Sequence, residues 1–163
     1  MQKVLNQYPE TKLCVTGHSL GGALSVLCGI RLALKFPDHD VQVINFGCPK
    51  VGNAAFAKLV NNKQNLCVHR VAHKSDVITR GPNLYYNHVG HTIHIDEAKD
   101  VEPRAFMWHN GKNAMTNWNP LMGYVLDHLM GGYIKALHSH KHDGINCEGE
   151  KPWVAAYEVM VNE

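Results

Sequence analysis

The sequence lacks the features that would point to a membrane span, a nucleic-acid partner or a disulfide framework. No apolar stretch reaches about 18 residues free of charge, so we expect no transmembrane helix. The formal net charge is +2 and the basic residues form no run or stripe, so we expect no nucleic-acid partner. The five cysteines show no C-x-x-C spacing, which predicts reduced thiols, buried where they lie in apolar runs. The N-terminal stretch MQKVLNQYPE is too polar for a signal peptide, and these features favour the cytoplasm without fixing the location.

The sequence does contain an alternation of short apolar strands and helices within a length typical of one domain. We predict strands at 12–17, 41–47, 65–72 and 87–95, and helices at 20–36, 54–60 and 121–137. The helix over 20–36 is apolar nearly all round, which predicts that it is buried, and Asn53 is placed to cap the next helix. The last helix is expected to be irregular around Gly131 and Gly132. This order predicts an α/β fold, a mainly parallel sheet with helices on its faces.

The stretch VTGHSLGGA places Ser19 between two glycines where a predicted strand meets a predicted helix. This is the setting of a nucleophile elbow, in which a strained serine lifts its hydroxyl above the carboxyl edge of the sheet. A plain glycine turn is the alternative. Gly17 and Gly21 are expected to lack bulk because strand and helix approach closely there, and Gly22 eases the helix–sheet contact. The helix N-terminus favours an anionic intermediate, so the N–H of Leu20 is predicted to form half of an oxyanion hole.

A serine nucleophile needs a base, and the base needs an orienting acid, in the chain order Ser, acid, His on this fold. Asp76 is the predicted acid, because it lies in the loop just after the strand over 65–72. Asp96 and Asp100 also follow a strand, but they belong to a densely charged stretch that is typical of a solvated face.

Twelve histidines compete for the role of base, and spacing leaves two of them open. His128 is far enough along the chain to return over the elbow and is favoured over His88. His18 is too close to Ser19 to turn toward it and is expected to pack beside the elbow. No catalytic role is expected for His91 and His94, placed with His88 in one strand, or for the tail of His138, His140 and His142, which is typical of a solvated run rather than a metal site.

Five stretches together resemble the class 3 lipases, the fungal-type triacylglycerol lipase family: VTGHSLGGALSVL, NFGCPKVGNAAFAKLV, HRVAHKSDVITRGP, YYNHVGHTIHI and DHLMGGYI. The resemblance implies an α/β-hydrolase fold with Ser19 as nucleophile, Asp76 as acid and His128 as base. It matches His88 to a position beside the site that is not the base. It implies no cofactor and no metal.

The sequence departs from the family at two points. The acid loop reads DVITRGP where the family usually has D-x-V-P-x-L-P, so Ile78 and Gly81 stand at the proline and leucine places. The family also carries an N-terminal half with the lid and a second oxyanion donor. We therefore expect residues 1–137 to be the C-terminal portion of such a domain and 138–163 to be an extension. A chain of this kind is expected to turn over slowly and to self-associate through an exposed sheet edge.

These features predict a lipase or esterase that hydrolyses carboxylic esters of lipids, or small soluble esters, either free or at a membrane or droplet interface. Two other functions stay open at this point. One is a lipase-like protein that binds or signals with little or no turnover, as in plant immune-signalling relatives of the family. The other is an acyltransferase or thioesterase built on the same elbow.

Overall fold

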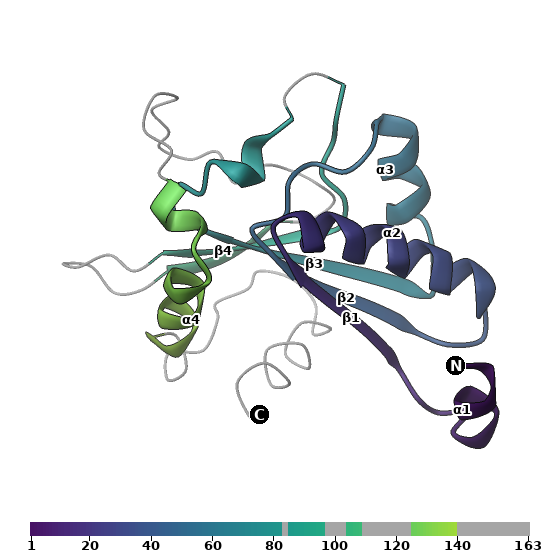
Figure 1. Cartoon of the computed structure of the whole chain (residues 1–163). Coiled ribbons are helices and arrows are strands. Elements are labelled where there is room, and N and C mark those ends of the chain that lie inside the picture. The colour runs from purple at the N-terminus through teal and green to yellow at the C-terminus, as the bar shows by residue number, and fades with distance from the viewer. Residues whose placement is uncertain (83–84, 97–103, 109–124, 140–163) are drawn as a thin grey trace.

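A computed structural model describes residues 1–82, 85–96, 104–108 and 125–139 of the chain (Figure 1). The helices are α1 (Gln2–Gln7), α2 (Leu20–Lys35), α3 (Ala54–Asn61) and α4 (Met130–Ser139), with short 3-10 helices η1 (Ile78–Arg80) and η2 (Val125–His128). The strands are β1 (Leu13–His18), β2 (Val41–Phe46), β3 (Leu66–His73), β4 (His91–Asp96) and β5 (Arg104–Trp108).

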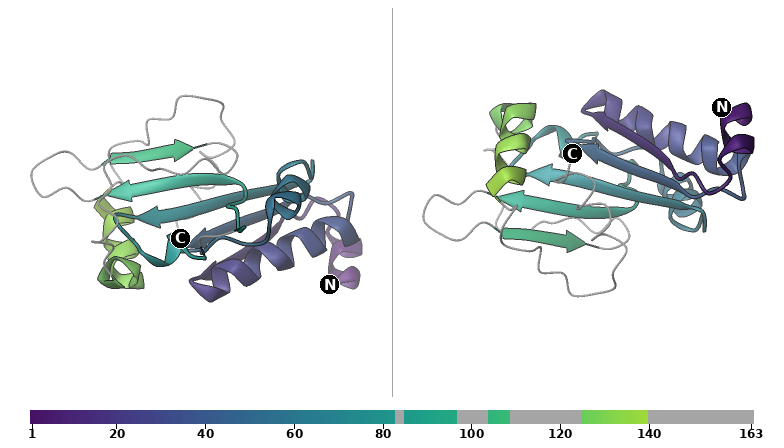
Figure 2. Two further views of the ribbon diagram at one scale, coloured as in Figure 1. Left: turned by 90° about the horizontal axis from the view of Figure 1, so that it is seen from above. Right: turned by 90° about the horizontal axis from the view of Figure 1, so that it is seen from below.

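The described strands form one sheet in the order β1-β2-β3-β4-β5. The first four strands run parallel, and β5 pairs antiparallel to β4. Helices α2 and α3 cover one face, and α4 lies on the other face near the carboxyl ends of β3 and β4 (Figures 1 and 2). The predicted α/β fold with a mainly parallel sheet is confirmed. Within the described residues β1 is an edge strand, and self-association through this edge stays a prediction.

Two apolar clusters fill the two faces of the sheet. The larger lies under α2 and α3 and is built on Val26, Ile30, Val43, Val60 and Val68. The second lies under α4 and consists of Val71, Ile93, Ile95, Tyr133 and Ala136. Successive side chains of a strand alternate between faces, so β3 contributes Val68 to one cluster and Val71 to the other.

The expectation that α2 is buried all round is wrong. Its sheet-facing side is buried, but Leu24, Leu27 and Leu34 are exposed on the opposite side. Apolar content alone could not separate the two sides, because apolar residues occupy both: Val26, Ile30 and Ala33 are on the buried side. The cysteine expectation is wrong in part: Cys48 is buried, whereas Cys14 on β1 and Cys28 on α2 are exposed.

Two asparagines fix the ends of helices by hydrogen bonds to the backbone. The side chain of Asn53 accepts the N–H of Phe56 at 3.0 Å, which confirms the predicted N-cap of α3. The amide nitrogen of Asn65 lies 3.0–3.1 Å from three carbonyl oxygens, those of Ala33, Phe36 and His39. Asn65 thereby ties the end of α2 to the start of β3.

Two predicted elements differ from the structure by more than one residue at an end. The fourth strand begins at His91 rather than at residue 87, because Gly90 turns the chain with a φ of +66° and donates its N–H to Asn61. The predicted last helix is two helices, η2 and α4, which meet at Leu129. Its irregularity therefore precedes Gly131 and Gly132, which lie in the first turn of α4. The first four residues of that predicted helix lie outside the described residues. Among the described helices, none has the length and apolar character needed to span a membrane.

Candidate active site

Ser19 stands at the junction of β1 and α2 in a strained backbone conformation, with φ 58° and ψ −124°. This is the left-handed half of the Ramachandran map, which L-residues avoid unless the surroundings impose it. Its N–H donates to the carbonyl of Phe46 at 3.0 Å, so the neighbouring strand β2 holds the turn in place. The predicted elbow geometry is therefore present at Ser19.

The glycines around Ser19 do not all serve the same purpose. A Cβ on Gly17 would lie 2.2 Å from the carbonyl oxygen of Gly21, a clash of backbone with side chain that no rotamer relieves. A Cβ on Gly22 would lie 3.0 Å from the Cβ of Cys48. A Cβ on Gly21 would meet nothing within 4 Å, so the expectation that this position must lack bulk is wrong.

Ser19, His128 and Asp76 form one line of hydrogen bonds. The Ser19 hydroxyl lies 2.8 Å from His128 Nε2, and His128 Nδ1 lies 2.9 Å from Asp76 Oδ2. Asp76 is buried with 1% of its side chain exposed, and its other carboxylate oxygen accepts the N–H of Ile78 at 2.9 Å. The arrangement can accept a proton from the hydroxyl at one imidazole nitrogen while a buried carboxylate stabilises the charge at the other.

Sequence reasoning missed Tyr133, which is fully buried beside Asp76. Its hydroxyl donates to Asp76 Oδ2 at 2.6 Å and accepts the backbone N–H of His73 at 3.2 Å. Burial and the nearby Asp76 charge raise the pKa of Tyr133, which keeps the proton on the donating oxygen. Tyr133 lies five residues after His128, within the stretch DHLMGGYI, but the sequence predicted no role for it.

Gly47 is a second residue that the sequence did not single out for the site. It follows β2 with a φ of +57°, and a Cβ there would lie 2.9 Å from both Asp76 Oδ2 and His128 Cε1. The absence of a side chain at Gly47 therefore leaves the space in which Asp76 and His128 meet.

The structure brings His128, and not His88, to Ser19. His88 is buried beyond the acid loop, and burial together with the charges of Arg70 and Lys50 lowers its pKa to about 2. A group that stays neutral at so low a pH is a poor proton acceptor. His88 also lies before β4 rather than within a strand.

His18 does more than pack beside the elbow. Its Nε2 lies 2.8 Å from the carbonyl oxygen of His128, and the two imidazole rings stack with centroids 4.6 Å apart.

The other residues weighed from the sequence lie away from this line or outside the described residues. Asp96 is the last residue of β4, and Asp100 lies outside the described residues. His94 donates to the carbonyl of Lys74 at 2.8 Å, and His91 lies next to His69 on the sheet. His138 is exposed on α4, whereas His140 and His142 lie outside the described residues, as does the rest of the predicted extension.

The N-terminus of α2 points its first N–H groups toward the serine side of the elbow. Leu20 is the first residue of the helix, and such N–H groups have no carbonyl partner within the helix itself. The predicted oxyanion donor is therefore placed directly after Ser19, where helix-end N–H groups and the helix dipole favour negative charge.

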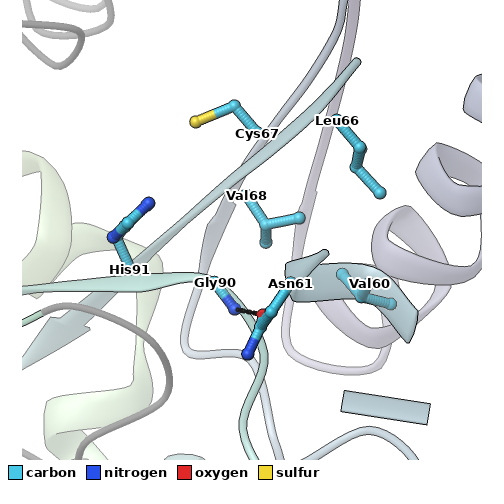
Figure 3. A pocket seen from close by; sticks show the side chains of 7 residues that line it. All are labelled: Val60, Asn61, Leu66, Cys67, Val68, Gly90 and His91. Atoms are coloured by element: carbon cyan, nitrogen blue, oxygen red, sulfur yellow. Dashed lines mark hydrogen bonds between the residues drawn. The ribbon is translucent and has the colours of Figure 1, made fainter. Parts of the chain in front are cut away.

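In the described part of the chain, no group of three histidine, cysteine or acidic side chains could hold a metal ion. A pocket of about 30 Å³ lies between Cys67, Gly90, His91 and Asn61, the last of which accepts the Gly90 N–H (Figure 3). It is formed at the amino ends of β3 and β4, opposite the edge that carries Ser19, and it has room for little more than a water molecule.

Comparison with known proteins assigns the family. The sequence profile of the family described as lipase (class 3) matches residues 1–86, more than half of the chain. The chain belongs to the class 3 lipases. The resemblance read from the sequence is confirmed, together with its α/β-hydrolase fold.

Three relatives of this class 3 lipase chain illustrate the match. Phospholipase A1-IIdelta of Arabidopsis thaliana is 32% identical over 138 residues, which cover 76% of this chain and 33% of that protein. The solved triacylglyceride lipase of Rhizomucor miehei superposes with a TM-score of 0.67 at 28% identity, covering 78% of this chain and 49% of that one. A solved triacylglycerol lipase described as having a serine-protease triad as its catalytic centre gives a TM-score of 0.65 at 26% identity, covering 78% and 50%. The chain thus spans about a third of the plant relative and about half of the two solved lipases.

Proposed function

We propose that this chain carries the catalytic centre of a serine hydrolase that cleaves carboxylic esters of lipids. Ser19 is the nucleophile, His128 the general base and Asp76 the acid that orients it. The observation that carries the proposal is the unbroken line of hydrogen bonds from Ser19 Oγ through both imidazole nitrogens of His128 to the buried Asp76 carboxylate. The family to which the chain belongs supports it.

The reaction begins when His128 Nε2 takes the proton of Ser19 as Oγ attacks the ester carbonyl carbon. The carbonyl oxygen becomes an oxyanion, which the N–H of Leu20 at the start of α2 stabilises. His128 then gives its proton to the leaving alcohol, and an acyl group remains on Ser19. Water, activated by His128 in the same way, attacks the acyl carbon, releases the free acid and restores the serine.

Exposed leucines next to Ser19 and next to His128 in the sequence support a lipid as the substrate. Leu20 directly follows the nucleophile with 69% of its surface exposed, and Leu126 precedes the base with 73% exposed. Leu129, directly after the base, and Leu24, one turn further along α2, are exposed as well. Exposed apolar residues gathered near polar catalytic groups suit a ligand with an apolar chain and a polar ester. Relatives named lipase and phospholipase A1 agree with this substrate class.

A fluorophosphonate probe and a short soluble ester, p-nitrophenyl butyrate, test the proposal on residues 1–163. We expect the probe to modify Ser19, as located by peptide mass spectrometry, and Ser19→Ala to abolish the modification. His128→Ala should lower ester turnover to the level of Ser19→Ala, about 10⁴- to 10⁶-fold, because the members of a triad act as a unit. His88→Ala should cost much less. His39→Ala, just beyond the far end of α2, is the matched control and should leave turnover unchanged.

Three results would contradict the proposal. Probe modification that persists in Ser19→Ala would remove Ser19 from the mechanism. Full turnover in His128→Ala would do the same for the base, and His88→Ala acting like Ser19→Ala would reverse the choice between the two histidines. A folded wild-type chain that neither reacts with the probe nor releases free acid would leave a lipase-like binding protein as the better reading.

A further inference from the structure

The backbone that carries the base is held at two consecutive carbonyl groups. In the turn between η2 and α4, the carbonyls of Leu126 and Leu129 accept backbone N–H groups, those of Leu129 and Gly132, at 3.2 and 3.0 Å. The two carbonyls between them, of Asp127 and His128, are met instead by imidazole nitrogens from distant parts of the chain.

His18 and His73 supply these nitrogens. His18 Nε2 lies 2.8 Å from the carbonyl oxygen of His128, and His73 Nδ1 lies 3.1 Å from the carbonyl oxygen of Asp127. A carbonyl oxygen only accepts, so the facing nitrogen of each imidazole must carry its proton. His18 is the last residue of β1 and His73 is the last residue of β3, so the two donors come from the carboxyl ends of strands on either side of β2.

Each of the two contacts is reinforced by a second one. The His18 ring stacks on the His128 ring, with centroids 4.6 Å apart and planes 29° apart. Next to His73, the backbone N–H of Ser75 donates to the side chain of Asp127 at 3.2 Å. His73 itself is 2% exposed and packs against the ring of Tyr133, which also bonds to Asp76.

We infer that His18 and His73 are positioning residues, which fix the backbone of Asp127 and His128 and thereby hold the His128 ring between Ser19 and Asp76. The inference rests on the proposed function of His128 as the base. Neither imidazole hydrogen-bonds to the Ser19 hydroxyl, and His18 meets the His128 ring only by stacking. Each acts by holding the peptide groups of Asp127 and His128 in place. This affects turnover, because a displacement of about 1 Å in a catalytic group can lower it about 100-fold.

Pairs of variants that differ in the donor alone test the inference. At His18, glutamine places an amide N–H near the position of Nε2, whereas phenylalanine keeps a ring for stacking and has no donor. At His73, asparagine places an amide N–H near the position of Nδ1, whereas leucine has a similar shape and no donor. His39→Phe, at the far end of α2, is the control for the loss of an imidazole as such.

We expect His18→Phe and His73→Leu to lower kcat on p-nitrophenyl butyrate about 10- to 100-fold with KM unchanged, and His18→Gln and His73→Asn to stay within about threefold of wild type. Proton NMR gives a readout that does not need turnover. The low-field resonance of the His128 Nδ1 proton, bonded to Asp76, should broaden or disappear in the variants without a donor and persist in those with one. The thermal unfolding midpoints of the two variants at each site should agree closely.

The outcomes separate the two proposals. If wild type is inactive toward ester and probe while the His128 proton signal still depends on the donor, the proposed function fails and the positioning role stands. If wild type is active and the variants with and without a donor give equal kcat and equal proton signals, the positioning role is overturned. If a variant without a donor fails to fold, the variant with a donor at the same site provides the test. A folded His18→Gln or His73→Asn that reaches only the rate of Ser19→Ala also overturns the positioning role.

Discussion

Ser19 and His128, the proposed nucleophile and base, are held in place by opposite means. Ser19 is fixed mainly within one short stretch of chain, by the close approach of Gly17 to the first turn of α2 and by a strained backbone, with one hydrogen bond from its N–H to Phe46 of β2. His128 stands on a short 3-10 helix whose described side-chain contacts come from residues 52 to 110 positions away. A nucleophile can thus be built by local steric rules, whereas its base is placed only when several strands have come together.

Disrupting the local packing that holds Ser19 should have the largest effect on stability. In Gly17→Ala the new Cβ meets the backbone of Gly21 at 2.2 Å, so strand and helix must separate, at a cost of about 3 kcal/mol in the free energy of unfolding. Urea denaturation measures it. The matched control is Gly21→Ala, whose Cβ meets nothing and which should be neutral or stabilising by up to about 1 kcal/mol. Equal losses in the two variants would show that the close approach at Gly17 is not what matters.

Disrupting the long-range packing that holds His128 against Asp76 should have a smaller effect on stability and a clear effect on catalysis. Gly47→Ala adds an atom 2.9 Å from both Asp76 and His128 at a position with φ of +57°, so we expect about 1–3 kcal/mol of lost stability. Turnover and the rate of fluorophosphonate labelling should fall about 100-fold, because acid and base are pushed apart. Gly131→Ala, at a glycine in the first turn of α4 where an added Cβ meets nothing within 4 Å, should change neither quantity. A Gly47→Ala variant with wild-type labelling would show that the pair tolerates the intrusion.

Lowering the pH should have the smallest effect on stability, because it acts only through the buried histidines around the acid loop and β3. Burial lowers the pKa of His69 to about 4, with a contribution from His91, and burial with Arg70 and Lys50 lowers that of His88 to about 2. Both groups stay neutral in the folded protein, while the unfolded chain takes up protons below about pH 6.5. Their stabilising contribution is therefore present above pH 6.5 and is lost as the pH falls toward 4 and 2.

The contribution of His88 to this pH dependence is measured by comparing His88→Leu with wild type. Between pH 7 and 5, His88→Leu should lose about 1–2 kcal/mol less unfolding free energy than wild type, since one proton fewer is taken up on unfolding. Urea titrations at the two pH values provide the measurement, and His39→Leu serves as the control, expected to follow the wild-type curve. A His88→Leu curve parallel to that of wild type would mean that His88 does not stay neutral in the folded state.

The sequence predicted the features that depend on neighbouring residues. The strand, elbow and helix around Ser19 follow from one stretch of chain, and the cap of α3 follows from Asn53 and the apolar residues after it. The order of strands and helices was enough for the α/β fold, because each element is a local pattern.

The remaining features depend on contacts between distant parts of the chain, which the spacing of residues in the sequence does not reveal. His88 and His128 could not be separated by position, because the choice depends on which one the folded sheet brings over Ser19. Tyr133 and Gly47 lie within stretches that resemble the family, but their contacts with Asp76 and His128 come from other elements, so their roles could not be predicted from position. The exposed leucines of α2 were misjudged because a helix that is apolar on two sides does not tell which side meets the sheet.

The strand order has a consequence for how the protein assembles. Each described strand pairs with the strand before it in the chain, so the sheet can grow at one edge by successive additions as the polypeptide emerges. Early steps need only neighbouring segments and complete the elbow with its strained serine. The segment that carries the base comes after all five described strands and must then reach back across the sheet to β1 and β3. In the proposed mechanism the base is therefore in place only after the five described strands have assembled, so a partly folded molecule would present Ser19 without His128 beside it.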